Sequence, residues 1–416
     1  MQDPTEHTVW RDDPRVAELN RWITSAGLSG RPHLEMLEAY CQRLVSIGVP
    51  LMRANVTVNA LHPVYGNLGF DWHDRQGAAR HEYGHTSDVN ENWIKSPFYY
   101  MLTEGLAEYR ERLCDDDTPS RFPLLAELKP LGASDYFATA TLFGDWNKTQ
   151  LISPDTQLEG SIMSWMSHGP AGFSDQDISL IRTTFPALAL ALRASSNRQT
   201  AVDLLGIYLG RDAGRRVLSG EIKRGSTQWI DAVICYFDLA GFTNMSQQVA
   251  GEDLIAMLND YFGLVVSGIE AEGGNVLKFM GDGLLAIFDR AAFDDAPDRA
   301  ITSVRALQDG ISALNSERET AGQRTFDYTI ALHAGPVLYG NIGADERLDF
   351  TVIGPEVNLA ARIGGMHKSL GQPVIISQTV ARDVTRQDCE LISLGRYMLR
   401  GVETPQELFT IYAGDP

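Results

Sequence analysis

A short acidic turn between two apolar runs, in the C-terminal half of the chain, constrains the fold more than any other feature. Residues 275–280 and 284–288 have the composition of strands, and the Gly-Asp-Gly around Asp282 has that of a tight turn. This pattern predicts a β-hairpin with Asp282 at its tip. A further apolar run of strand type, residues 232–237, ends in Asp238. If that strand lies beside the hairpin, the two carboxylates converge.

The residues after Asp238 extend the same pattern. Asp238 is followed by Leu-Ala and then by Gly241, Phe242 and Thr243, which suit a glycine turn and a helix start. A carboxylate at a strand end next to free N–H groups of a helix start can present a metal ion to phosphates. Two such carboxylates can bind a pair of Mg²⁺ ions about 3.5 to 4 Å apart. Taken alone, Asp238 fits an aspartate that merely caps the next helix equally well.

Three stretches together resemble the successive signatures of class III adenylyl and guanylyl cyclases. They are Phe-Asp-Leu-Ala-Gly-Phe-Thr at 237–243, Lys-Phe-Met-Gly-Asp-Gly at 278–283 and Asp-Phe-Thr-Val-Ile-Gly-Pro-Glu-Val-Asn-Leu-Ala-Ala-Arg at 349–362. The resemblance covers about residues 229–414. It implies an α+β, ferredoxin-like (palm-type) domain with an antiparallel-rich sheet and flanking helices. It also implies conversion of a nucleoside triphosphate into a cyclic nucleotide and pyrophosphate.

The resemblance assigns the acidic residues and their neighbours to metal and phosphate binding. Asp238 and Asp282 match the two metal-binding aspartates, and the carbonyl oxygen of Leu239 matches the additional ligand. Two Mg²⁺ ions are implied at each site, and Mn²⁺ can substitute for them. The backbone amides expected to hold the phosphates are those of Gly241, Phe242 and Thr243.

Two positions are expected to select the base. Lys278 occupies the place where adenylyl cyclases carry the lysine that contacts adenine and where guanylyl cyclases usually carry Glu. Thr351 occupies the second place, where many adenylyl cyclases have Asp, and so resembles a Thr-bearing subgroup, several of whose members respond to bicarbonate. A hydroxyl can donate or accept a hydrogen bond, so Thr351 alone does not choose the base. Lys278 therefore favours ATP, and a guanylate cyclase remains the alternative.

A helix expected to begin near Pro355 carries the remaining catalytic candidates. Asn358 and Arg362 are four residues apart and lie on one face of such a helix. By resemblance, Asn358 orients the ribose and Arg362 stabilises charge on the α-phosphate. Arg400 matches a position that contacts the terminal phosphates. His333 also falls in a family motif, but we expect a packed strand-end histidine without a chemical role.

The resemblance also predicts the assembly. In the family the two aspartates come from one subunit and the base-reading and transition-state residues from the other. This chain has each set once, so we expect a homodimer with two shared sites. A catalytically silent nucleotide-binding regulator is the other alternative. Such a protein would be expected to lack one of the catalytic groups, whereas the sequence has Asp238, Asp282, Asn358 and Arg362. A diguanylate cyclase would need a Gly-Gly-Asp/Glu-Glu-Phe turn, which the sequence lacks.

The N-terminal part has the pattern of a separate small α+β domain that resembles GAF-like sensor modules in element order and position. We expect this domain at 1–204, a linker at 205–228 and the catalytic domain at 229–416. The resemblance allows for a small-molecule ligand of the first domain, whose identity the sequence does not give. Its expected elements are helices at 33–48 and 97–112 and strands at 54–61, 68–73, 136–143 and 160–167.

A terminal helix is expected to connect the two domains. Ser174 and Asp177 have the spacing of a capping box at its start. Pro186 is expected to interrupt the helix, with Thr183 or Thr184 capping the second piece.

Charge and composition exclude several partners. The net charge of −19 disfavours nucleic acid and anionic membranes, because no basic patch offsets it. The longest purely apolar run, residues 185–192, is far shorter than a membrane span, and residues 1–13 lack the pattern of an export signal. Four scattered cysteines fit the reduced thiols of a cytoplasmic protein. His73, His81 and His85 lie close together in the sequence, and we interpret them as surface histidines and not as a metal site.

Overall fold

The computed structural model describes residues 13–59, 65–84, 91–114, 120–143, 160–221 and 223–412. The chain divides into two compact units, Met1–Leu204 and Leu205–Pro416. Each unit combines helices with an antiparallel-rich sheet, which confirms the predicted α+β class.

The N-terminal unit is built on a six-stranded antiparallel sheet with the order β3-β2-β1-β6-β5-β4. Its strands are β1 (Leu51–Asn59), β2 (Tyr65–His73), β3 (Gly77–Gly84), β4 (Glu108–Arg112), β5 (Asp135–Leu142) and β6 (Gly160–Ser167). Neighbouring residues of β6 point to opposite faces, as the period of a strand requires. Trp165 is buried in one hydrophobic cluster and Met166 in another.

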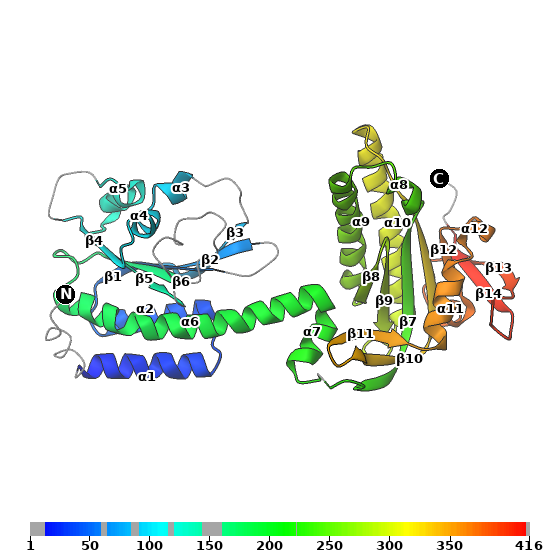
Figure 1. Cartoon of the computed structure of the whole chain (residues 1–416), viewed down its shortest axis with the longest axis horizontal. Coiled ribbons are helices and arrows are strands. Elements are labelled where there is room, and N and C mark those ends of the chain that lie inside the picture. The colour runs from blue at the N-terminus through cyan, green and yellow to red at the C-terminus, as the bar shows by residue number, and fades with distance from the viewer. Residues whose placement is uncertain are drawn as a thin grey trace. The chain divides into compact units, whose positions relative to one another are not determined.

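Helices cover both faces of this sheet (Figure 1). The cluster with Trp165 packs under α1 (Pro14–Leu28), α2 (His33–Ser46) and α6 (Asp175–Leu209). The cluster with Met166 packs under the short helices α4 (Pro97–Thr103) and α5 (Pro123–Leu128), which α3 (Glu91–Ile94) precedes and a 3-10 turn (Lys129–Leu131) follows.

Two sequence expectations about helix ends are wrong. The helix expected at 97–112 ends at Thr103, because Gly105 adopts a left-handed φ of 64° and the chain then enters β4, which pairs with β5. Pro186 does not interrupt α6, which runs unbroken for 35 residues. Thr183 and Thr184 donate to carbonyls of the preceding turn instead of capping a new helix. The buried Thr184 also shares a 3.0 Å hydrogen bond with Tyr40 of α2.

The capping box at the start of α6 is confirmed. The backbone N–H of Ser174 donates to the Asp177 carboxylate at 2.9 Å, and the N–H of Asp177 donates to the Ser174 hydroxyl at 3.2 Å.

The neighbouring histidines of the N-terminal unit have separate partners. His73 contacts Asp74 at 2.7 Å and His81 contacts Asp71 at 3.2 Å, whereas His85 lies outside the described residues. Over the described ranges, no group of three or more His, Cys, Asp or Glu could hold a metal ion.

The C-terminal unit contains an eight-stranded sheet with the order β13-β14-β12-β10-β7-β9-β8, and β11 pairs with β10. All pairings are antiparallel except β10 with β12. Its strands are β7 (Thr227–Ala240), β8 (Asn275–Met280), β9 (Gly283–Asp289), β10 (Asp327–Ala344), β11 (Arg347–Ile353), β12 (Val374–Ser377), β13 (Leu391–Tyr397) and β14 (Gln406–Ile411).

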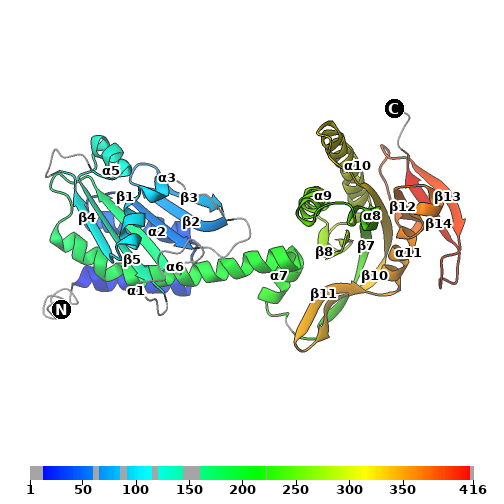
Figure 2. The ribbon, with the colours of Figure 1, turned by 45° about the horizontal axis from the view of Figure 1, so that its top comes forward.

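The helices of this unit lie on both faces of its sheet (Figures 1 and 2). Cys235 and Phe237 of β7 pack toward α9 (Gly251–Ala271) and α10 (Ala296–Thr320). Tyr236, which points the other way, packs toward α11 (Pro355–Gly364). The remaining helices are α7 (Arg211–Leu218), α8 (Phe242–Met245), α12 (His367–Leu370) and α13 (Gln378–Ala381).

Much of the linker predicted at 205–228 is helical, because α6 continues to Leu209 and α7 covers Arg211–Leu218. Gly214 lies inside α7, where a Cβ atom would come within 2.8 Å of the Leu205 backbone, so this glycine permits a close approach of α7 to the end of α6. Ala213 is buried against the C-terminal sheet.

In the described part of the chain, α9 alone is long and apolar enough to cross a membrane by length and composition. Its buried residues Met257, Tyr261, Val265 and Ile269 belong to the core of the C-terminal unit.

Candidate active site

Asp238 and Asp282 lie side by side where β7 meets the β8–β9 hairpin. The predicted hairpin is confirmed, with Asp282 between the strands and Gly283 paired with Asp238. The N–H of Leu239 donates to the Asp282 carbonyl at 3.1 Å. A Cβ atom at Gly283 would lie 2.8 Å from Oδ1 of Asp238, so only glycine leaves room for that carboxylate.

The electrostatics of this pair fit a divalent cation. Burial, and to a smaller extent the neighbouring charge of Asp282, together raise the pKa of Asp238 from 3.8 to about 6. Among the described residues, no Lys or Arg forms an ion pair with either carboxylate. Two close carboxylates without a compensating cation are a donor set suited to Mg²⁺ or Mn²⁺. The buried Leu239, between Asp238 and the glycine turn, places its backbone next to them.

The residues expected to hold phosphates directly follow β7. Gly241 has a left-handed φ of 81°, and α8 begins at Phe242. The first N–H groups of a helix have no intrahelical partner, so those of Phe242 and Thr243 are available to an anion. The Phe242 ring packs 6.0 Å from that of Phe326, which anchors the turn to the core.

The two expected base-reading residues lie on β8 and β11. Nζ of Lys278 donates to Oδ2 of Asp349 at 3.3 Å. Asp349 and Thr351 are two residues apart on one strand, so their side chains share a face. Thr351 is only 5% exposed, and its hydroxyl has no hydrogen-bond partner within the described chain. Sequence reasoning missed Asp349, although its opposite charge to Lys278 and its spacing from Thr351 were visible signals.

The α11 residues form a separate group. The helix begins at Pro355 as predicted, and Asn358 and Arg362 are both exposed on it. The guanidinium of Arg362 donates to the Gly401 carbonyl at 3.1 Å, so Arg362 lies beside the turn that carries the exposed Arg400. Across the described residues, no hydrogen bond or ion pair joins Asn358, Arg362 or Arg400 to the two aspartates.

A buried contact fixes the first turn of α11. His333 is 1% exposed, lies inside β10 and not at a strand end, and shares a 2.5 Å hydrogen bond with Glu356. Burial lowers the pKa of His333. Gly335 makes room for this contact, because a Cβ atom there would lie 2.8 Å from Cγ of Glu356. Sequence reasoning gave His333 no role, and this contact shows that it anchors the helix that carries Asn358 and Arg362.

Comparison with known families fits this arrangement. Residues 226–413 match the family model described as the adenylate and guanylate cyclase catalytic domain. The C-terminal unit therefore carries a cyclase catalytic domain. The match begins at the start of β7 and ends after β14, so it includes all of the candidate residues above.

Several known proteins are similar to this domain. Adenylate cyclase 1 of Rhizobium meliloti is 27% identical over 53% of this chain and 33% of its own length, and an adenylate cyclase of Anabaena cylindrica is 31% identical over 40% and 32%. The chain thus spans about a third of the length of these curated relatives. Among solved structures, the adenylyl cyclase CyaB from P. aeruginosa has a TM-score of 0.42 at 23% identity, covering 45% of this chain and 97% of that one. The guanylyl cyclase Cya2 has a TM-score of 0.40 at 28% identity, covering 44% and 92%.

Proposed function

We propose that this chain is an adenylate cyclase that converts Mg-ATP into 3′,5′-cyclic AMP and pyrophosphate as a homodimer. The observation that carries the proposal is the pair Asp238 and Asp282. The two carboxylates lie together, without a paired cation among the described residues, next to a helix start with free amides. The relatives that bear the name adenylate cyclase support the same reaction class.

In this proposal the C-terminal residues divide the work on the triphosphate. Asp238, Asp282 and the Leu239 carbonyl would hold two divalent ions, which lower the pKa of the ribose 3′-hydroxyl and screen the phosphate charge. The amides at 241–243 would bind phosphate oxygens. Arg362 would stabilise the charge that develops at the α-phosphate, because its planar guanidinium presents donors in a fixed geometry.

The remaining residues would place the nucleoside. Asn358 would orient the ribose, and Arg400 would contact the terminal phosphates from the turn next to Arg362. Lys278 and Thr351 would read the adenine. The buried Thr351 hydroxyl has no hydrogen-bond partner among the described residues, which supports this role, because buried polar groups are nearly always hydrogen-bonded. A guanylate cyclase is the second candidate, since the family model that matches residues 226–413 describes both adenylate and guanylate cyclases.

The homodimer is proposed from the separation of the two residue sets. Among the described residues, no hydrogen bond or ion pair joins Asp238 or Asp282 to the residues of α11 or to Arg400. Two copies would complete two equivalent sites, each using the aspartates of one subunit and α11 of the other. A silent nucleotide-binding regulator would need the same dimer but would release no product.

We propose that the N-terminal unit regulates this activity, as a GAF-like sensor connected through α6. Removal of residues 1–204 tests that part. Equal activity with and without them, under every ligand tried, would contradict it.

Turnover of purified full-length protein tests the proposed reaction. ATP or GTP is supplied with Mg²⁺ or Mn²⁺, and the cyclic products are quantified beside Asp238→Ala. We expect metal-dependent cyclic AMP that is absent from the variant. Cyclic GMP as the main product would overturn the choice of base. If neither ATP nor GTP gives a cyclic product, and the isolated residues 205–416 are inactive as well, the silent regulator is favoured.

A further inference from the structure

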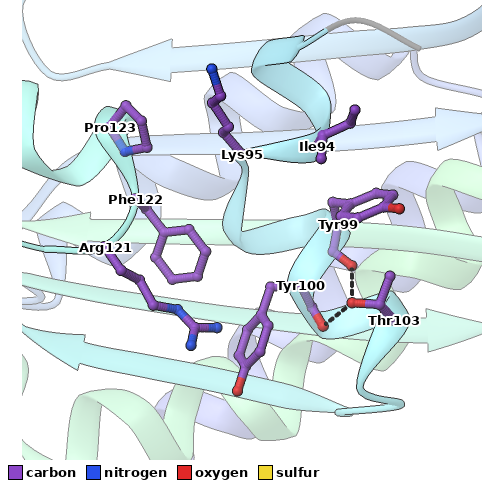
Figure 3. A pocket seen from close by; sticks show the side chains of 8 residues that line it. All are labelled: Ile94, Lys95, Tyr99, Tyr100, Thr103, Arg121, Phe122 and Pro123. Carbon is purple, nitrogen blue, oxygen red and sulfur yellow. Dashed lines mark hydrogen bonds between the residues drawn. The ribbon is translucent and has the colours of Figure 1, made fainter.

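The N-terminal unit has a cavity of about 520 Å³ on the face of its sheet that carries the short helices (Figure 3). Residues of α4, of the turn before it and of the end of α3 form one wall, and the turn into α5 with the first residue of that helix forms the other. The lining residues are Ile94, Lys95, Tyr99, Tyr100, Thr103, Arg121, Phe122 and Pro123. Its volume is within the range of small-molecule sites, roughly 300 to 1,000 Å³.

Packing within the unit makes the aromatic part of this cavity rigid. The Tyr100 ring lies 5.7 Å from that of Tyr109 and 5.8 Å from that of Phe122. Tyr109 and Phe122 are themselves 5.5 Å apart in an edge-to-face contact. Phe122 is only 5% exposed, so its ring is fixed by the core. This packing holds the half-buried Tyr100 in place, so a flat ligand can contact it at little entropic cost.

The cavity also presents a positive charge. The guanidinium carbon of Arg121 lies 3.5 Å from the Tyr100 ring centroid and 4.7 Å from that of Phe122. Within the described ranges, no carboxylate forms an ion pair with Arg121, whose neighbours are the aromatic side chains of Tyr100, Phe122 and Tyr109. An arginine held flat on a ring keeps the N–H groups at its edge free for a planar oxyanion.

The second cation of the cavity is already neutralised. Lys95 forms a 2.8 Å ion pair with Glu91, and both side chains are exposed. Figure 3 shows Tyr99 and Phe122 on opposite sides of the cavity, with Tyr100 and Arg121 along one edge. Among the described residues, the cavity therefore combines aromatic walls with one guanidinium that no carboxylate pairs, which suits a flat ligand with a single negative charge at its end.

We propose that this cavity binds a small planar aromatic carboxylate. The carboxylate accepts hydrogen bonds from Arg121, and the ring of the ligand lies against the half-buried side chains of Tyr99 and Tyr100. The proposal concerns the N-terminal unit and holds whether or not the C-terminal unit turns over nucleotide. A neutral compound of the same shape loses the charged contact, which is worth about 1.5 to 3 kcal/mol, or roughly a tenfold to hundredfold change in affinity.

Binding to the full-length protein tests the proposal. The probes are benzoate, pyridine-3-carboxylate and indole-3-acetate, each paired with its neutral amide, and binding is measured by ligand-detected NMR and calorimetry. We expect at least one carboxylate to bind at least tenfold more tightly than its amide. No binding by any of the three, or equal binding of acid and amide, would overturn the proposal.

Matched arginine variants locate the site. Arg121→Gln should lower the affinity for that carboxylate about tenfold or more. Arg21→Gln makes the same charge change on α1, which covers the other face of the sheet, and should leave the affinity unchanged. Arg121 is exposed, so both variants should fold, which thermal unfolding checks. Equal affinity of wild type and Arg121→Gln would place the binding elsewhere and contradict the proposal.

Discussion

His333 and Glu356 share a 2.5 Å hydrogen bond that ties the middle of β10 to the first turn of α11. The other ring nitrogen of His333 is 3.3 Å from the Thr379 hydroxyl, so the buried imidazole has a partner on each side. The helix that carries Asn358 and Arg362 is thus held by a contact that touches neither residue.

Removal of the hydrogen bond between His333 and Glu356 should lower kcat more than it changes KM. Glu356→Ala leaves a buried ring nitrogen without a partner, which costs about 1 to 3 kcal/mol of stability. Because small displacements of catalytic groups are costly, we expect kcat to fall about tenfold to a hundredfold with a smaller change in KM. Glu356→Gln, which can still form a hydrogen bond, should recover most of the activity, and Glu319→Ala on the exposed end of α10 should have no effect. A Glu356→Ala enzyme with wild-type kcat would contradict this role.

Asp238 should make the stability of the metal-free protein depend on pH. Its pKa is raised from 3.8 to about 6 by burial and by Asp282, so the folded state favours the protonated form. The resulting stability is complete below the unfolded pKa of 3.8 and is lost as the pH rises through about 6. Asp238→Asn should therefore raise the melting temperature at pH 7.5, and this gain should vanish as the pH falls toward 4.

A titration with metal ions tests whether Asp238 is also a metal ligand. Mn²⁺ should raise the melting temperature of the wild type, because a ligand that binds only the folded state stabilises it. The effect should weaken below about pH 6, where protons compete for Asp238. The rise in melting temperature with Mn²⁺ should be absent from Asp238→Asn. It should be unchanged in Asp294→Asn, which alters an exposed aspartate of the same unit. Equal stabilisation of the wild type and Asp238→Asn by Mn²⁺ would exclude Asp238 as a ligand.

Lys278 should determine the choice of nucleotide. Lys278→Glu replaces a donor with an acceptor next to Asp349, so kcat/KM for ATP should fall about tenfold to a hundredfold, and the ratio of ATP to GTP turnover should fall with it. The matched change Lys368→Glu lies on α12 and should alter neither kcat/KM for ATP nor the ratio of ATP to GTP turnover. An unchanged ratio in Lys278→Glu would show that other groups read the base.

Local patterns predicted the parts of the fold that short-range rules determine. The Gly-Asp-Gly turn placed Asp282 between β8 and β9, Pro355 marked the start of α11, and Ser174 with Asp177 formed the capping box. Each depends on a few adjacent residues with well-defined backbone preferences.

Tertiary contacts decided the features that the sequence did not predict. Pro186 remains inside α6 because burial of that helix against α2 and the sheet offsets the loss of one hydrogen bond. The bond between His333 and Glu356 joins residues 23 positions apart, and that between Lys278 and Asp349 joins residues 71 apart. A single sequence shows the charges of these residues but not which of them the fold brings together. The roles of the candidate site residues remain predictions.

Mixing two inactive variants tests the central claim, a shared adenylate cyclase site, most directly. Asp238→Asn and Arg362→Ala are purified, shown to be inactive alone, combined in equal amounts under conditions that exchange subunits, and assayed for cyclic AMP from Mn-ATP. Random pairing gives half heterodimers, each with one intact site, so activity should return to about a quarter of the wild-type value. Mixtures that stay inactive although subunit exchange is verified, or single variants that retain wild-type activity, would contradict the account.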